Sequence, residues 1–246
     1  MRVFSAILTL AILLLPNLLK ADTIKLTSLE WPPYTSASMK EQGASVAVAK
    51  AAFKAMGHEL VVEFYPWKRA VHLAKEGQFD GYFPEYYSEE LKQDFVLSEP
   101  MGSGPLGFAE LTSKPISWST LEDLKKFKVG VVSGYVNTTD FDKMVAEKAI
   151  KASEASDDVK NLLKLSTGRT ELAVVDQNVL SYLLASDPKL KAQAGKIQFN
   201  STLLEDKQLY VCFKKGARGE KLAGILNEGL KKIDVAAIMK GYLESL

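Results

Sequence analysis

Short apolar runs and segments with apolar residues at helical spacing alternate along residues 24–83. The runs have the length and β-branched content of strands, and the segments between them carry apolar residues three and four positions apart, which is typical of helices that cover a sheet. The predicted strands are residues 24–29, 60–65 and 79–83, and the predicted helices are residues 45–56 and 67–75. This order predicts a β-α-β-α-β unit with largely parallel strands.

A second alternating series follows the Gly- and Pro-rich segment 102–105, which we interpret as a crossing between two units. Apolar runs suggest strands at 106–111, 129–132 and 172–175, with two more between 197 and 213, and helical patterns cover 137–149, 157–165, 220–233 and 235–243. Asn137 or Thr138 is expected to cap the first of these helices. The whole pattern predicts an α/β fold with mostly parallel sheets.

The first 21 residues have the pattern of a secretory leader. Arg2 precedes the apolar run 3–15, and Pro16 and a short polar exit lead to Ala21, after which we place the cleavage. The run is shorter than the roughly 20 residues that span a bilayer, and no cysteine ends the leader to accept a lipid. We therefore expect a periplasmic protein without a lipid anchor; a retained anchor is the alternative.

Composition and charge exclude several classes of protein. The 246 residues are 47% hydrophobic and 25% charged, as in ordinary globular domains. A formal charge of +1, or 29 basic against 30 acidic residues once Arg2 and Lys20 are removed, gives no basic field for nucleic acid. Cys212 stands alone in an apolar run and is expected to be a buried core thiol. His58 and His72 lack partners at ligand spacing, so we expect no metal and no other cofactor.

One short motif occurs twice. Gly77 and Gly168 are each followed three residues later by an acid and then by an apolar strand, and Glu85 and Asp176 stand eight residues after the two glycines. Both carboxylates would then lie at the C-terminal ends of strands, where open α/β sheets bind ligands. A chance match is the alternative; a true repeat would present two acids to one cleft.

A set of motifs in this order and spacing resembles the family 3 extracellular solute-binding proteins, the polar amino-acid receptors of ABC importers. The motifs are Trp31-Pro32-Pro33-Tyr34, Gly43, and the segments 73–81, 95–100, 121–124, 128–131 and 168–176. The resemblance covers essentially all of the mature chain. It implies two α/β lobes of the type II periplasmic-binding fold, joined by two crossing segments, with a small polar solute held between them.

The resemblance also implies an organisation and partners. After the signal peptide 1–21, the first lobe would comprise residues 22–104 and 204–246, and the second lobe residues 105–203. The lobes would close on the ligand about the crossings, and an inner-membrane ABC permease would recognise the closed monomer.

The sequence departs from the family where the ligand would bind. In amino-acid receptors an arginine of the first lobe holds the ligand carboxylate and an aspartate of the second lobe holds its ammonium group. Leu91 stands at the arginine position here, bulky residues 84–87 and 134–136 replace small hydroxyl residues, and Ser45 replaces an acid. Asp176 alone keeps its expected character, so the ligand chemistry has to be inferred from the residues that are present.

Those residues combine two carboxylates with several aromatic rings, including Tyr86. This combination favours a cation or a ring, because aromatic faces attract cations and a desolvated carboxylate needs a partner. Arg69 near a helix start, and the backbone N–H groups of the turn after Ser133, offer another route that would bind an anion. Each aromatic or basic residue could instead serve packing or a solvated surface. The candidate ligand-binding residues are Trp31, Tyr34, Trp67, Arg69, Glu85, Tyr87, Ser133, Tyr135 and Asp176.

The resemblance implies a non-catalytic receptor, with two alternatives from other classes. The fold also carries periplasmic enzymes that resemble cyclohexadienyl dehydratase, in which Glu85 would be the general acid; leucine at position 91 argues against such an enzyme, because its dicarboxylate substrate needs arginine. The other alternative is a sensory protein whose closed form signals to a receptor instead of serving a permease.

Overall fold

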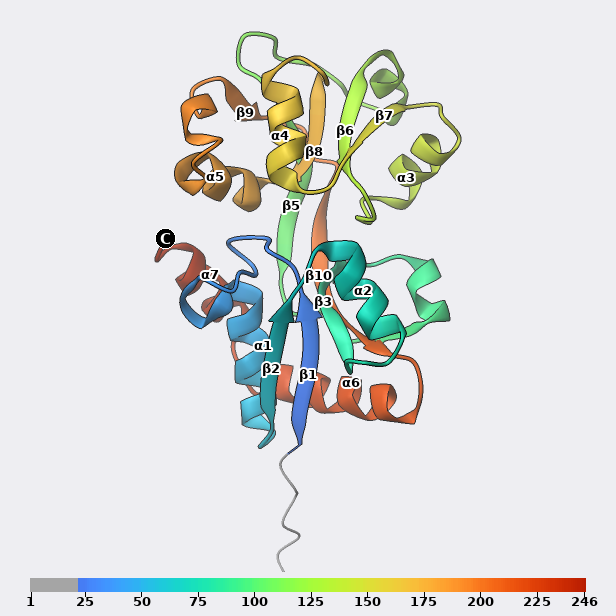
Figure 1. Cartoon of the computed structure of the whole chain (residues 1–246), viewed down its shortest axis with the longest axis vertical. Coiled ribbons are helices and arrows are strands. Elements are labelled where there is room, and N and C mark those ends of the chain that lie inside the picture. Colours follow the sequence, from blue (N-terminus) through green and yellow to red (C-terminus); the bar gives the residue numbers. More distant parts are fainter. Residues whose placement is uncertain (1–21) are drawn as a thin grey trace, which may run out of the picture.

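Residues 22–246 are described by a computed structural model, and they form two α/β lobes that share one curled, ten-stranded sheet (Figure 1). The strand order is β2-β1-β3-β10-β5-β8-β6-β7, with β4 paired to β10 and β9 to β5. The strands are β1 (Thr23–Ser28), β2 (Glu59–Phe64), β3 (Gly81–Tyr86), β4 (Phe95–Leu97), β5 (Ser103–Leu111), β6 (Lys128–Val132), β7 (Lys151–Ala155), β8 (Leu172–Asp176), β9 (Ile197–Phe199) and β10 (Glu205–Lys214). The helices are α1 (Ala44–Ala55), α2 (Trp67–Lys75), α3 (Thr139–Ala146), α4 (Asp158–Ser166), α5 (Gln177–Ser186), α6 (Ala217–Leu230) and α7 (Val235–Leu243), with short 3₁₀ helices at Lys40–Gln42, Glu89–Gln93, Leu121–Lys126 and Lys191–Gln193.

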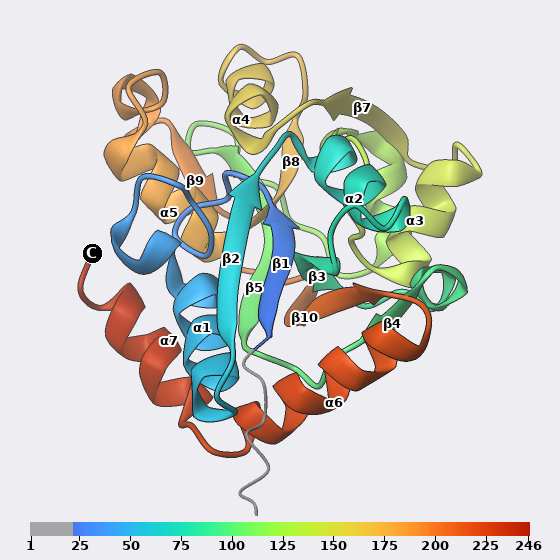
Figure 2. The ribbon, with the colours of Figure 1, turned by 60° about the horizontal axis from the view of Figure 1, so that its bottom comes forward.

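The first lobe is the predicted β-α-β-α-β unit, completed by the C-terminal part of the chain. Strand β1 lies between β2 and β3 and runs parallel to both, and β10 adds an antiparallel neighbour to β3. Helices α1, α6 and α7 lie together on one side of this sheet and α2 on the other (Figure 2). The apolar face of α1 is buried through Phe53, whose ring meets Phe213 edge to face.

In the second lobe β6 pairs in parallel with β7 and β8, and the antiparallel strand β5 borders β8. The prediction of one helix over 137–149 was wrong. Helix α3 ends at Ala146, the chain turns through Lys148 with a φ of 60°, and β7 follows. The sequence pattern did not indicate β7 because it is an edge strand with polar or small residues, of which only Ala155 is buried. Helix α5 was also missed. The prediction of the cap of α3 is confirmed, because Thr138, one of the two expected residues, caps this helix.

The two lobes are joined by β5 and β10, which run antiparallel past each other between them (Figure 1). Their pairing extends from Ser103 with Gln208 to Leu106 with Glu205. The predicted fold class, two α/β lobes with two crossing segments, is confirmed. The sheets are mixed and not mostly parallel, because β5 and β10 pair antiparallel with all their neighbours. The limits 22–104, 105–203 and 204–246 for the lobes remain a prediction.

The repeated glycine–acid motif has the same geometry in both lobes. The carboxylate of Asp80 accepts a hydrogen bond from the backbone N–H of Lys25, and that of Glu171 accepts one from Lys128, each at 2.9 Å. Lys25 lies near the start of β1 and Lys128 begins β6, so each acid binds the first part of the strand beside its own. The match is therefore structural, and it places the ends of β3 and β8 at equivalent edges of the two lobes.

Three further predictions concern Cys212, membrane-spanning helices and the leader. Cys212 is buried in the first lobe, as expected. None of the helices within residues 22–246 is long and apolar enough to cross a bilayer. The predicted signal peptide lies outside the described residues.

Candidate functional site

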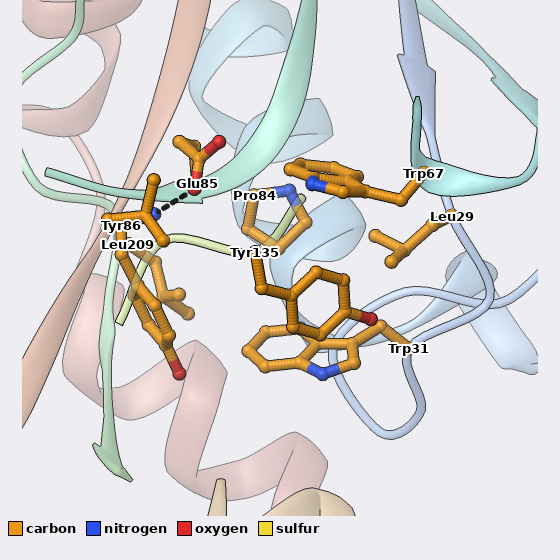
Figure 3. Close-up of a pocket in the computed structure, with 9 residues that line it drawn as sticks. Leu29, Trp31, Trp67, Pro84, Glu85, Tyr86, Tyr135 and Leu209 are labelled. Atoms are coloured by element: carbon orange, nitrogen blue, oxygen red, sulfur yellow. Dashed lines mark hydrogen bonds between the residues drawn. The ribbon is translucent and has the colours of Figure 1, made fainter. Parts of the chain in front are cut away.

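A pocket lies between the two lobes, at the C-terminal ends of the parallel strands, where open α/β sheets bind ligands (Figure 3). It is lined by Leu29, Trp31, Trp67, Pro84, Glu85, Tyr86, Tyr135, Val136 and Leu209. These residues come from the loop after β1, the start of α2, the end of β3, the turn after β6, and β10. The cavity that they leave measures about 20 Å³, room for about one water molecule. The lobes are therefore closed on each other in this structure.

Aromatic side chains form much of the contact between the lobes. Pro66 precedes α2, so Trp67 starts the helix and points toward the second lobe. Its Nε1–H donates to the carbonyl of Gly134 at 2.9 Å, and its ring meets that of Tyr135 edge to face with 5.9 Å between centroids. Trp31 stacks on Tyr34 at 4.6 Å, from the loop after β1. The sequence predicted that four aromatic residues share one cleft, and in the structure they lie where the lobes meet: Trp31, Tyr34, Trp67 and Tyr135.

Asp176 connects the lobes by hydrogen bonds. As the last residue of β8 it caps α5, accepting from the backbone N–H groups of Asn178 at 2.7 Å and Val179 at 3.1 Å. It also accepts from the Tyr34 hydroxyl at 3.2 Å, while the side-chain amide of Asn178 donates to that hydroxyl at 2.7 Å. Only 1% of Asp176 is exposed, and burial raises the pKa of its carboxyl to about 7.

Glu85 is the corresponding acid of the first lobe. It lies in β3, is 5% exposed, and accepts hydrogen bonds from its neighbour Tyr86 (backbone N–H, 2.8 Å) and from the Tyr82 hydroxyl (3.1 Å). Burial raises the pKa of Glu85 to about 8, although these two bonds and the charge of Lys207 act in the opposite direction.

A third buried acid, Asp158, was not predicted. It is the first residue of α4 and accepts a hydrogen bond from the Tyr135 hydroxyl at 3.0 Å. Burial raises its pKa to about 7, and the adjacent Asp157 adds to the increase. The sequence pattern placed Asp157 and Asp158 only at the start of a helix. The one feature that could have indicated a further role for Asp158 is that it is a second acid directly after Asp157, which caps the helix.

Lys207 and Tyr86 complete the surroundings of the pocket. Lys207 lies in β10, is 5% exposed, and has its ammonium 3.4 Å from Glu205 and 5.6 Å from the centroid of the Tyr86 ring. Lys207 was not predicted as a site residue either. Its position in a segment expected to cross between the lobes was the one feature that could have indicated such a role. The buried Tyr86 hydroxyl has no hydrogen-bond partner among the described residues.

Five candidate residues do not line the central pocket. Tyr34 and Asp176 bond to each other between the lobes, and the other three lie on the surface or in adjoining grooves. Arg69 is exposed on α2, with its guanidinium 5.2 Å from the centroid of the Tyr65 ring. Tyr87 lines a groove on the β10 side of the cleft and donates to Glu89. Ser133 lines another groove beside α2 and donates to Glu154 at 2.6 Å.

The site therefore offers aromatic faces and carboxyl groups. At neutral pH the carboxyls of Asp158 and Asp176 are near their pKa values of about 7, and Glu85 at about 8 is mostly protonated, so each can bind a cation on losing its proton. Within residues 22–246 no group of three or more His, Cys, Asp or Glu side chains is arranged to hold a metal ion.

Comparisons with known proteins support the fold. No protein-family model matches the chain, and no curated protein sequence does. Among solved structures, an ancestral arginine-binding protein bound to arginine is 20% identical, with a TM-score of 0.72 over 91% of this chain and 97% of that one. A histidine kinase sensor domain with similarity to periplasmic binding proteins is 17% identical (TM-score 0.75, 92% and 96%). The substrate-binding protein of an amino acid ABC transporter is 17% identical (TM-score 0.70, 91% and 98%).

These likenesses and the cleft define a class. The chain has the two-lobed fold of the periplasmic binding proteins. Two of these three similar structures are an arginine-binding protein and the substrate-binding protein of an amino acid ABC transporter, so the resemblance to family 3 solute-binding proteins is confirmed for the fold.

Proposed function

We propose that this protein is a receptor that captures a small polar solute, an amino acid or a related amine, between its lobes. The observation that carries the proposal is the pocket itself, which is lined from both lobes and buried where they meet. The proposed location is the periplasm, where the monomeric receptor would deliver its solute to an ABC permease, as the similar transporter protein supports.

The proposed mechanism is closure about β5 and β10. The bonds from Trp67 to Gly134 and from Tyr34 to Asp176 join opposite lobes, so they exist only while the lobes are together. The cavity of about 20 Å³ in this form is too small for an amino acid, so a bound ligand would hold the lobes farther apart than they are here. It stabilises that liganded closed form to the extent that it makes contacts there which the open form lacks. Trp31, Trp67, Tyr135, Glu85 and Asp176 are the proposed inner contacts.

The proposed outer contacts are Arg69, Tyr87 and Ser133, at the mouths of the cleft. There each could meet a ligand as it enters, because grooves beside Tyr87 and Ser133 adjoin the contact between the lobes. Sensing is the second candidate function, favoured by the similar histidine kinase sensor domain. Catalysis is not proposed, because the similar proteins are mostly binding proteins and the arginines of residues 22–246 are all exposed.

A binding screen tests the proposal. Mature protein is heated with amino acids, amines, small carboxylates and sugars, and a ligand at 100 times its Kd should add about 2.7 kcal/mol to the free energy of unfolding. Asp176→Asn should weaken the best cationic hit more than about tenfold while leaving the fold intact, since asparagine still caps a helix.

Two measurements would refute the receptor function. A screen in which no class of solute raises the unfolding temperature, together with X-ray scattering that shows no closure, would refute the receptor function. Stimulation of a reconstituted permease by the loaded protein would separate transport from sensing.

A further inference from the structure

We propose that the solute is an organic amine that carries no carboxylate group. This inference rests on the proposed function and narrows its ligand class. It follows from the balance of charge in the closed cleft, from the positions of the basic residues, and from one buried hydroxyl group without a partner.

The cleft holds more acid than base. Asp158 and Asp176 from the second lobe and Glu85 from the first are all at most 6% exposed. Lys207 is the one basic side chain of the described residues that is buried, and its ammonium already lies 3.4 Å from Glu205 and against the Tyr86 ring. A cation entering the cleft would pair with these acids as they lose their protons, whereas an anion would find no opposite charge there besides Lys207.

Acidic residues also predominate at the rim of the cleft. A groove beside the pocket, formed by the loop after β1 and by α4 and α5, is lined by Glu30, Asp157, Asp158 and Asp187. Lys160 offsets one of these charges through its bond to Asp157 at 2.9 Å. Acids concentrated at an entrance raise the local concentration of cations.

The described residues provide no guanidinium to hold a carboxylate in the cleft. Arg69, Arg169 and Arg218 are exposed, and Arg218 is bonded to Asp80 on the far side of the first lobe. Leu91 packs against the core of that lobe. A ligand carboxylate buried beside three acids would have only Lys207 as a charged partner, so its desolvation would be poorly compensated.

Tyr86 supplies the independent observation. Its hydroxyl is buried and lacks a hydrogen-bond partner among the described residues, although the side chain lines the pocket. Burial, and then the charges of Asp176, Tyr34 and Asp158, raise the pKa of Tyr86. The phenol oxygen can accept an N–H from an ammonium group that also contacts the two aspartates. The rings of Trp31 and Tyr135 would then face the same cation.

Matched ligand pairs test the inference. Calorimetry at pH 8 compares agmatine with arginine, cadaverine with lysine, and tyramine with tyrosine on the mature protein. The expected result is that the amine binds at least about tenfold more tightly than its parent amino acid in every pair that binds, since the parent adds a buried, poorly paired carboxylate. An amino acid that binds as tightly as its amine would overturn the inference and leave the receptor function standing.

The remaining outcomes are also distinguishable. Binding of a sugar, a dicarboxylate or a neutral amino acid, with no amine bound, overturns the inference alone. No binding by any compound in either experiment overturns both the inference and the proposed function.

Single-residue variants test whether the amine contacts Asp158 and Tyr86. Asp158→Asn should weaken amine binding more than about tenfold, whereas Asp140→Asn, at an exposed aspartate of the same lobe, should leave it unchanged. Tyr86→Phe should weaken binding several-fold without lowering the unfolding temperature, because it removes a buried hydroxyl that has no partner. Unchanged amine affinity in both Asp158→Asn and Tyr86→Phe would contradict the site.

Discussion

At the scale of single residues, the cleft depends on a small residue as much as on charged ones. Gly104 lies in β5, where a β-carbon would overlap the carboxylate of Asp176 and the hydroxyl of Tyr34. The bond between those two side chains joins the lobes, so it forms only because position 104 leaves room for it. The sequence marked Gly104 only as part of a crossing, since which side chains approach a glycine is decided by tertiary contacts.

Gly104→Ala should therefore weaken binding of the best ligand. Overpacking of this kind costs about 1–3 kcal/mol, which corresponds to an affinity about 5- to 150-fold lower. Calorimetry measures the effect. The control is Gly224→Ala, because this exposed glycine of α6 has open space around it and alanine favours a helix. Equal affinity in the two variants would show that the contact at Gly104 is unimportant.

At the scale of elements, the repeated glycine–acid motif explains how a strand in each lobe is fixed. Gly77 and Gly168 follow α2 and α4 with φ values of 74° and 71°, a conformation that glycine adopts without strain. The chain then returns so that Asp80 or Glu171 meets the start of the neighbouring strand. Spacing alone revealed this motif, because all of its parts are close in sequence.

Glu171→Ala should lower the free energy of unfolding by about 0.5–1.5 kcal/mol, the usual net value of one hydrogen bond. Glu171→Gln should retain most of it, because the amide oxygen can still accept the N–H of Lys128. Urea unfolding of the two variants measures the difference. Identical losses would mean that the negative charge, and not the hydrogen bond, stabilises this turn.

At the scale of the whole molecule, closure buries acids that come from both lobes. Burial raises the pKa of Glu85 to about 8 and the pKa values of Asp158 and Asp176 to about 7, from ordinary values near 4. The folded state therefore retains protons that the unfolded chain has released. Stability falls with rising pH wherever the folded state binds more protons.

The protein without ligand should accordingly become less stable as the pH rises from about 5 to about 8.5. Thermal unfolding across this range measures the slope, and Glu85→Gln should flatten its upper part. A cationic ligand binds the ionised acids, so its affinity should increase over the same range. A stability that stays level or rises from pH 5 to 8 would contradict the burial of these carboxyls.

The sequence by itself determined the alternation of elements, the first β-α-β-α-β unit, and the acids Glu85 and Asp176 at strand ends. These depend on local periodicity and on short spacings, which a chain displays before it folds. Edge strand β7 was missed because its polar residues show little periodic pattern. Helix α5 was missed because Asp176, the residue that caps it, was interpreted only as a ligand-binding residue.

Tertiary structure alone decided which residues share the cleft. Asp158, Lys207 and the hydroxyl of Tyr86 are each buried near the contact between the lobes, which β5 and β10 join. Burial then sets the chemistry of each group, as the raised pKa values of Asp158 and Glu85 show. Burial is a property of the packed molecule, because it depends on residues that are far apart in the sequence.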